Sequence, residues 1–431
     1  MDRIKKTVGI SKENTNIENI VNLLMLFNMI IIGGDRLSFK VGGMTIRLVQ
    51  ITLLITFALM FIERKVFLKK IWLFIPFLVA NIISTVFSDY FKTGVTYIIW
   101  TIYNYVFVFS LFYSWCKSKS KEWVIDFWLV SFVIQGIYVV FQYIIGLNKI
   151  NDPFFPMQVH LNVYRPAIWF YEPSYLATYF SVYLSIAFYL YLSTGKNKYL
   201  LNTIFSSFCL LIISSSLGYL SIVLIFGTGI VINILITKKL NIKRLLTSIG
   251  SFGCIFIILN FVDPNMFDVF LGRMIPDASH QSVVSDEPEN VVNKLENSSL
   301  GAASGGRITA WKETLEVFGD NSVVGIGPNA YPQYTGKGLP PTNVSLELLA
   351  NLGILGFVTF LIFVFGVITV SIKNREKNDY MSLSVLFALI IFAAVLQANQ
   401  NYLRLYMWMH MGILLAISIK DEKNVFIKEK N

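Results

Sequence analysis

Long apolar runs separated by short polar segments constrain this chain more than any other feature of its sequence. Hydrophobic residues make up 55% of its 431 residues, and the charged residues, only 14%, gather between the runs. Many runs have about 17–25 residues, the length that an α-helix needs to cross a bilayer. The sequence therefore excludes an ordinary soluble protein and predicts an all-α polytopic membrane protein.

The runs predict about 12 transmembrane helices. They lie near residues 17–33, 46–62, 71–87, 95–115, 123–146, 174–193, 200–214, 217–236, 245–262, 345–372, 380–396 and 405–419. The first nine helices, with short loops and an outer loop at 147–173, occupy residues 1–262. Residues 263–343 are predicted to form one large extracytoplasmic loop, and residues 344–431 contain the last three helices and a cytoplasmic tail.

Positive charge gives an independent test of this topology. With a cytoplasmic N-terminus, 24 of the 36 Lys and Arg residues fall in segments predicted to lie inside, as the positive-inside rule requires. The C-terminus is then cytoplasmic as well. The net charge of +10 is thus explained by topology, and it gives no reason to expect nucleic acid as a partner.

Cysteine and histidine are too few and too scattered for a metal site or a disulfide framework. The chain has three of each, far apart in sequence, and no cluster has the spacing of metal ligands. We therefore expect chemistry that is independent of metal ions and cofactors.

The shorter outer loop ends in residues suited to hold a charged site. Proline is favoured at the first position of a helix, so the sixth span is expected to begin at Pro173, with Tyr171 and Glu172 at its mouth. Arg165 precedes Pro166, and the two prolines predict a bent backbone that fixes Arg165 and Glu172 in place. A salt bridge between these two side chains, tying loop to helix, is the alternative interpretation.

The longer loop is predicted to contain an amphipathic helix. Ile308, Trp311, Leu315 and Phe318 recur at three- and four-residue intervals, which indicates an apolar stripe lying on the membrane or on the bundle. Arg307 falls on the first turn of this helix, after two glycines that let the backbone approach a ligand closely. Alternatively, Arg307 only anchors the helix at the interface.

Arginine at an outer membrane interface suits a lipid-linked diphosphate, because planar guanidinium groups bind phosphate oxygens in bidentate fashion. In glycosyl transfer, negative charge builds on the departing diphosphate, and fixed positive groups stabilise it. We therefore predict catalytic roles for Arg165 and Arg307, and for Glu172 as base or orienter of the incoming hydroxyl. Predicted substrate-binding residues are Asn343, Trp311, Arg404 and Tyr171. Core packing for Trp311 and interfacial anchoring for Arg404 are the alternatives.

These segments resemble the O-antigen ligase and polymerase family. The residues that carry the resemblance are 165–174, 305–311, 324–327, 342–347 and 352–357. The resemblance implies a GT-C-like helical bundle in the bacterial cytoplasmic membrane that acts on undecaprenyl-diphosphate-linked oligosaccharide. It also puts Arg165 and Arg307 at the positions of arginines implicated in binding the lipid diphosphate.

One departure from the family pattern bears on the reaction. Ligases carry His-Asn at the end of the large loop, where this chain has Thr342-Asn343. The resemblance therefore favours a Wzy-type polymerase of capsule, exopolysaccharide or O-antigen, with a chain-length regulator and a flippase as expected partners. A ligase is the alternative within the family. A lipid-linked oligosaccharide transporter is the alternative outside it, although the few charges deep in the spans speak against it.

Single introduced cysteines test the predicted sides of the membrane. Asn290→Cys should react with a membrane-impermeant maleimide in intact spheroplasts, whereas Asn241→Cys should react only after the membrane is breached, because the positive charges place residues 237–244 inside. Labelling of residue 290 only after breaching would contradict the topology.

Overall fold

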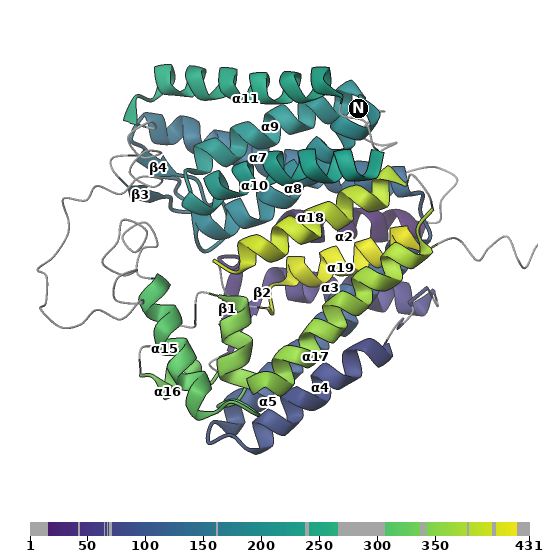
Figure 1. Cartoon of the computed structure of the whole chain (residues 1–431), viewed down its shortest axis with the longest axis vertical. Helices are drawn as coiled ribbons and strands as arrows, with labels where there is room; N and C mark the ends of the chain where they lie inside the picture. Colours follow the sequence, from purple (N-terminus) through teal and green to yellow (C-terminus); the bar gives the residue numbers. More distant parts are fainter. Residues whose placement is uncertain are drawn as a thin grey trace, which may run out of the picture.

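A computed structural model describes residues 16–41, 44–63, 65–66, 68, 71–160, 163–237, 241–265, 307–336, 341, 343–376, 379–398 and 402–419. Most helices in this part of the chain run roughly along one direction and form a bundle (Figure 1). Each apolar run identified in the sequence contains a helix.

The elements follow one another in this order. They are α2 (Asn16–Ile31), β1 (Ser38–Val41), β2 (Met44–Arg47), α3 (Leu48–Ile62), α4 (Ile71–Val86), α5 (Phe91–Tyr103), η1 (Asn104–Phe109), α6 (Ser110–Lys117), α7 (Lys121–Leu147), β3 (Gln158–His160), β4 (Val163–Arg165), α8 (Pro173–Thr194), α9 (Asn197–Ile213), α10 (Ser216–Thr237), α11 (Ile242–Val262), α15 (Arg307–Asp320), α16 (Tyr331–Tyr334), α17 (Val344–Asn374), α18 (Tyr380–Leu396) and α19 (Leu405–Ser418). η1 is a π-helical segment inside a continuous helix.

The protein is a multi-pass membrane protein by the length and composition of these helices. Five described helices are long and apolar enough to cross a membrane, namely Phe91–Lys117, Lys121–Leu147, Pro173–Thr194, Ile242–Val262 and Val344–Asn374. Shorter apolar helices of 10–17 residues occupy the other seven runs. The total of about 12 spans therefore stays a prediction.

Helix α8 forms the centre of the bundle. Every residue from Tyr175 to Leu192 is buried, and α8 packs against α18, α9 and α10. By contrast, α11 lies at the edge, with Ile258 and Phe261 exposed. Because a lipid-facing surface must be apolar, such exposed side chains are expected of a bundle that sits in a bilayer.

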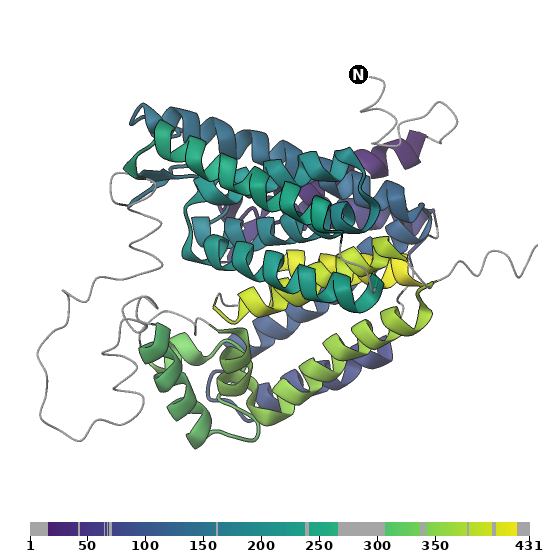
Figure 2. The same cartoon turned by 45° about the horizontal axis from the view of Figure 1, so that its top comes forward.

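The two ends of the bundle differ. The elements from the segments predicted to be outer loops, β3, β4, α15 and α16, lie at one end, on the left in Figures 1 and 2. We call this the outer end, and the opposite one the inner end. Arg36, just before β1, bonds to Pro156 in the shorter of these loops. The described part of the chain is mostly helical, as predicted, and it also contains two short antiparallel hairpins that were not predicted, β1 with β2 and β3 with β4.

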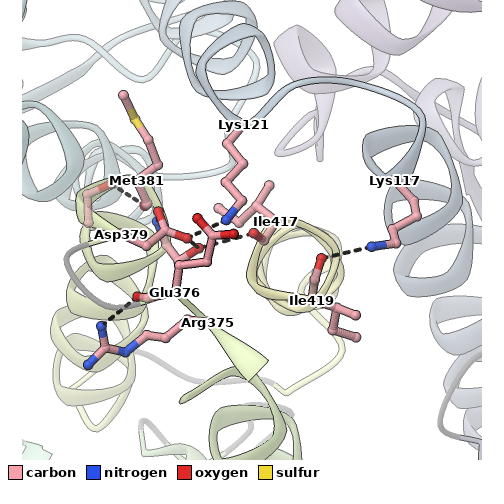
Figure 3. Close-up of polar contacts among 10 residues, drawn as sticks. Lys117, Lys121, Arg375, Glu376, Asp379, Met381, Ile417 and Ile419 are labelled. Carbon is pink, nitrogen blue, oxygen red and sulfur yellow. Dashed lines mark hydrogen bonds and ion pairs between the residues drawn. The ribbon is translucent and has the colours of Figure 1, made fainter. Parts of the chain in front are cut away.

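Polar contacts fasten the helices at the inner end (Figure 3). The Lys121 Nζ lies 2.5 Å from the Asp379 Oδ2, and the Lys117 Nζ donates to the Ile419 carbonyl at 2.8 Å. Burial raises the pKa of Asp379, but hydrogen bonds from Lys121 and Ser382 outweigh this and hold the pKa below its ordinary value. The basic residues at this end therefore tie α6 and α7 to the C-terminal helices.

Helix α17 is broken at Gly353, and residues 322–327 of the longer loop lie at the break. Gly353 has φ 65° and ψ −169°, and Figure 1 shows the two arms that result. The Ile326 and Gly327 N–H groups donate to the Ala350 and Asn351 carbonyls at 3.1 and 2.9 Å. Across the break, the N–H groups of residues 354 and 355 donate to the carbonyls of residues 322 and 323 at 2.8 and 3.2 Å.

Only glycine fits the two backbones that cross at this break. Gly325 and Gly353 both have positive φ, at 70° and 65°. A Cβ on Gly353 would lie 2.3 Å from the Val323 carbonyl oxygen, and one on Gly325 would lie 2.4 Å from the Asn351 carbonyl carbon. Gly325, in the 324–327 motif, and Gly353, in the 352–357 motif, therefore allow the backbones of the longer loop and the broken helix to come into contact.

Gly353→Ala tests this contact. The left-handed conformation alone should lower the free energy of unfolding by about 1–3 kcal/mol, and displacement of the Val323 backbone should add to the loss. Gly253→Ala in α11 is the matched control, since its Cβ would meet no atom within 4 Å and alanine favours the helix. Thermal unfolding in detergent measures both variants, and equal stability of the two would contradict the account.

Candidate functional site

The candidate residues lie at the outer end, where hydrogen bonds and ion pairs connect segments distant in sequence. Residues 32–37 contact residues 151–175 and 402–406, and the start of α17 contacts the end of α18. The fold therefore brings together segments from several of the predicted outer loops at this end.

The shorter outer loop is held on α7 by one glutamine and one aspartate. The Gln142 Nε2 donates to the Asp152 Oδ2 at 2.7 Å, and its Oε1 accepts from the Ala167 and Ile168 N–H groups at 3.1 and 2.9 Å. Tyr138 also donates to Asp152 at 2.7 Å. Burial raises the pKa of Asp152, but these hydrogen bonds, together with those from the Phe154 and Phe155 N–H groups, outweigh it and lower the pKa overall.

Ile168 stores backbone strain within this loop. Its φ is 44°, a region that β-branched residues rarely adopt, and its side chain is fully buried. Such strain, of about 1–3 kcal/mol, persists only where the surroundings impose it, and it is common at functional sites. Here the Gln142 side chain imposes the turn that leads into residues 169–172.

Arg165 and Glu172, both predicted to be catalytic, have separate contacts in the described part of the chain. Arg165 is 9% exposed at the end of β4, and its Nε donates to the Ser214 carbonyl at 2.8 Å. Glu172 is the N-cap of α8, which begins at Pro173 as predicted. Its Oε2 accepts from the Ser174 hydroxyl at 2.8 Å.

Arg404 belongs to a charge cluster that sequence reasoning did not find. Arg404 Nη1 and Arg47 Nη2 lie 2.7 and 3.0 Å from the two carboxylate oxygens of Asp35, and the Arg404 guanidinium lies 4.0 Å from the centre of the Tyr175 ring. Two guanidinium groups thus share one carboxylate. Burial lowers the pKa of Arg404, but the charge of Asp35, the hydrogen bond to it and the neighbouring tyrosines together raise the pKa above its ordinary value.

Arg36, between α2 and β1, connects that segment to the segment before α8. Its Nη1 donates to the Pro156 carbonyl at 2.5 Å and its Nη2 to the Tyr171 carbonyl at 3.1 Å, while its backbone N–H donates to the Trp169 carbonyl at 3.0 Å. Burial lowers the pKa of Arg36. The Tyr171 side chain, a predicted substrate contact, is 61% exposed beside it.

Asn343 has a structural contact. Its side chain accepts from the Leu346 N–H at 3.0 Å and caps the N-terminus of α17. Nearby, the Ser345 hydroxyl donates to the Gln397 Oε1 at 2.7 Å.

Glu347 in the first turn of α17 is fully buried. Burial, with a further contribution from the charge of Glu347, raises the pKa of Tyr402 well above its ordinary value.

Helix α15 is present, but its buried face differs from the predicted stripe. Thr314 and Val317 are buried, whereas Leu315 is 50% exposed, because the helix packs on α17 and residues 326–331 through a neighbouring face. Trp311 is partly buried, and its indole N–H is buried without a hydrogen-bond partner among the described residues. Arg307 is the first residue of α15, and its side chain lies outside the described residues.

Among the described residues, no group of three or more His, Cys, Asp and Glu side chains is placed to hold a metal ion. Metal independence stays a prediction.

The residues that sequence reasoning missed are Asp35, Arg36, Tyr175 and Gln142. A signal for the first two was present, since Gly34-Asp35-Arg36 directly follows the first apolar run and ionisable groups at a span end have a partner or a function. Tyr175 and Gln142 resemble ordinary residues of apolar helices, and only the tertiary contacts reveal their roles.

Comparison with known proteins supports the resemblance seen in the sequence. Residues 201–361 match the family model of O-antigen ligase, and a search of curated proteins finds no match. The matched part contains Arg307, Trp311, Asn343 and the crossing at Gly353, whereas Arg165, Glu172 and Arg404 lie outside it. The match confirms the resemblance over these residues and supports glycan transfer of the ligase or polymerase type.

Asp35→Asn tests whether the new charge cluster holds the outer end together. Removing the carboxylate leaves two arginines without a counter-charge, which should lower the free energy of unfolding by about 3 kcal/mol. The control is Asp126→Asn, whose partner Lys198 is 46% exposed and whose loss should change stability by about 1 kcal/mol or less. Equal losses in thermal unfolding would show that the cluster has no special role.

Proposed function

We propose that this protein is a polysaccharide polymerase of the bacterial cytoplasmic membrane. It joins oligosaccharide repeat units carried on polyprenyl diphosphate into capsular polysaccharide, exopolysaccharide or O-antigen at the outer face. The observation that carries the proposal is the gathering of Arg36, Arg47, Arg165 and Arg404 at one end of an apolar bundle. The O-antigen ligase match over residues 201–361 supports the same reaction class.

In the proposed reaction, one lipid-linked glycan donates its glycosyl group to a hydroxyl of another. The hydroxyl oxygen forms a bond to the anomeric carbon, and the bond from that carbon to the diphosphate oxygen breaks. The electron pair leaves with the diphosphate, and the hydroxyl proton passes to a base. Because the leaving group gains negative charge, groups that stabilise it most in the transition state raise the rate.

Arg165 and Arg307 are proposed to bind the diphosphate. The hydrogen bond from the Arg165 Nε to Ser214 orients a rigid, planar fork, which suits bidentate binding of phosphate oxygens. Glu172, at the mouth of α8, is proposed to orient the acceptor hydroxyl or accept its proton. Tyr171, Trp311, Asn343 and Arg404 are proposed as further substrate contacts, with no metal ion or cofactor in the reaction.

Transfer to a different acceptor, as in an O-antigen ligase, is a second candidate function. The description of the matching family favours it. Against it, threonine stands at position 342, directly before Asn343, where ligases of this family carry histidine. The proposed polymerase would work with a flippase that delivers its substrate and with a chain-length regulator.

Arg165→Ala and Arg307→Ala should each abolish long polysaccharide while single lipid-linked repeats persist. Losing one charge-assisted phosphate contact in the transition state lowers the rate about 10²–10³-fold, and lysine should restore little because it cannot form the bidentate fork. Electrophoresis of polysaccharide from complemented deletion strains measures chain length.

The matched control is Arg375→Ala at the inner end, where Arg375 donates to the Glu376 carbonyl. It should leave chain length unchanged at equal protein level. Wild-type chain lengths in both outer variants would overturn the catalytic assignment.

A further inference from the structure

An apolar groove lies beside the outer end, between α2 and α7. It has a volume of about 750 Å³, and its lining includes Phe27, Ile31, Ile134, Ile137, Phe141 and Trp169. Four of these residues are exposed, with Ile137 at 61%, Phe141 at 47%, and Phe27 and Ile134 at 39% each. Because the bundle sits in a bilayer, the groove faces the lipid.

The groove extends from the outer end into the depth of the bilayer. Helix α7 ends at Leu147, so at about 1.5 Å per residue, Ile134 lies about 20 Å from that end and Phe141 about 9 Å. On the other wall, Phe27 and Ile31 belong to the last turn or two of α2. A ligand in this groove would therefore have an elongated apolar part below the surface.

Positive charge borders the outer end of the groove. Leu37 and Leu48 line it, they are joined by a backbone hydrogen bond of 2.7 Å, and each is adjacent in sequence to an arginine, Arg36 or Arg47. Arg36 also donates to the Pro156 carbonyl, next to Phe155 in the lining. The groove thus matches an amphiphile with an apolar chain and an anionic head.

One wall of the groove is rigid. The Tyr138 and Trp169 rings stack at 5.8 Å with 17° between their planes, and the Tyr138 hydroxyl is held by Asp152 at 2.7 Å. Because Trp169 follows the strained Ile168, the wall belongs to the same loop that carries Tyr171 and Glu172. A chain bound in the groove therefore has its head beside the candidate site.

We propose that this groove binds the isoprenoid chain of the lipid-linked substrate, namely the units nearest the diphosphate, and so directs the diphosphate toward the arginines of the outer end. The inference rests on the proposed function, because it names where the carrier of that substrate lies. Branched isoprene units fit the groove, whose lining consists of isoleucine, leucine and aromatic side chains.

The test uses a polyprenyl diphosphate with a diazirine in an isoprene unit close to the diphosphate, added to the purified full chain in nanodiscs. After irradiation, mass spectrometry should find the label on peptides of α2 and α7. Excess unlabelled polyprenyl diphosphate should displace it, and the same excess of phosphatidylglycerol should not.

Ile134→Trp fills the groove and should lower this labelling about tenfold or more, since loss of two buried methylene contacts already corresponds to about tenfold in affinity. Ile258→Trp, at a lipid-facing position of α11 that is 60% exposed, is the matched control and should label as the wild type does. Circular dichroism and thermal unfolding establish that both variants are folded.

Equal labelling of α11, equal displacement by phosphatidylglycerol, or full labelling of Ile134→Trp would overturn the inference. Polymer formation by the same preparations is measured separately. Label on other helices together with normal polymer formation would refute the groove and leave the function standing. Absence of both label and polymer would refute the groove and the function together.

Discussion

The outer end depends on the place where the backbone of the longer loop crosses the broken helix α17, at Gly325 and Gly353. In a bilayer, a helix can be interrupted only where the freed N–H and C=O groups find partners within the protein. Residues 322–327 supply those partners on both sides of Gly353, and the crossing is so close that Gly325 and Gly353 accept no side chain. This part of the longer loop is thereby fixed to the bundle, and α15 also packs on α17.

Four arginines, Arg36, Arg47, Arg165 and Arg404, lie at the outer end of the described part of the chain. Asp35 is shared by Arg47 and Arg404, and the other arginines there donate to backbone carbonyls, as Arg36 and Arg165 do. Hydrogen bonds to these carbonyls orient the two guanidinium groups. Such a surface attracts an anionic headgroup at the membrane interface, and the adjacent apolar groove suits its chain. Under the proposed function, neighbouring parts of the same loops would bind the lipid chain and act on its headgroup.

Sequence reasoning found the elements whose signals are local. Hydrophobic runs predicted the helices, Pro173 predicted the start of α8, and periodicity predicted α15, although Leu315 proved exposed. It missed what depends on tertiary contacts: the hairpins, the break at Gly353, and the ion pairs of Asp35, whose partners lie 12 and 369 residues away. It assigned the glycines of residues 324–327 and 352–357 to a family pattern, and their physical role emerged only when the two backbones were seen to cross.

In the proposed function, the protein itself forms glycosidic bonds between lipid-linked repeat units. The most direct measurement incubates purified protein in proteoliposomes with a single polyprenyl-diphosphate-linked repeat unit and EDTA, and resolves the products by mass spectrometry. We expect a series of lipid-linked products that increase by one repeat unit, with loss of the series in Arg165→Ala. Products that form only on a different acceptor, or transport of the repeat unit with no new glycosidic bond, would contradict it.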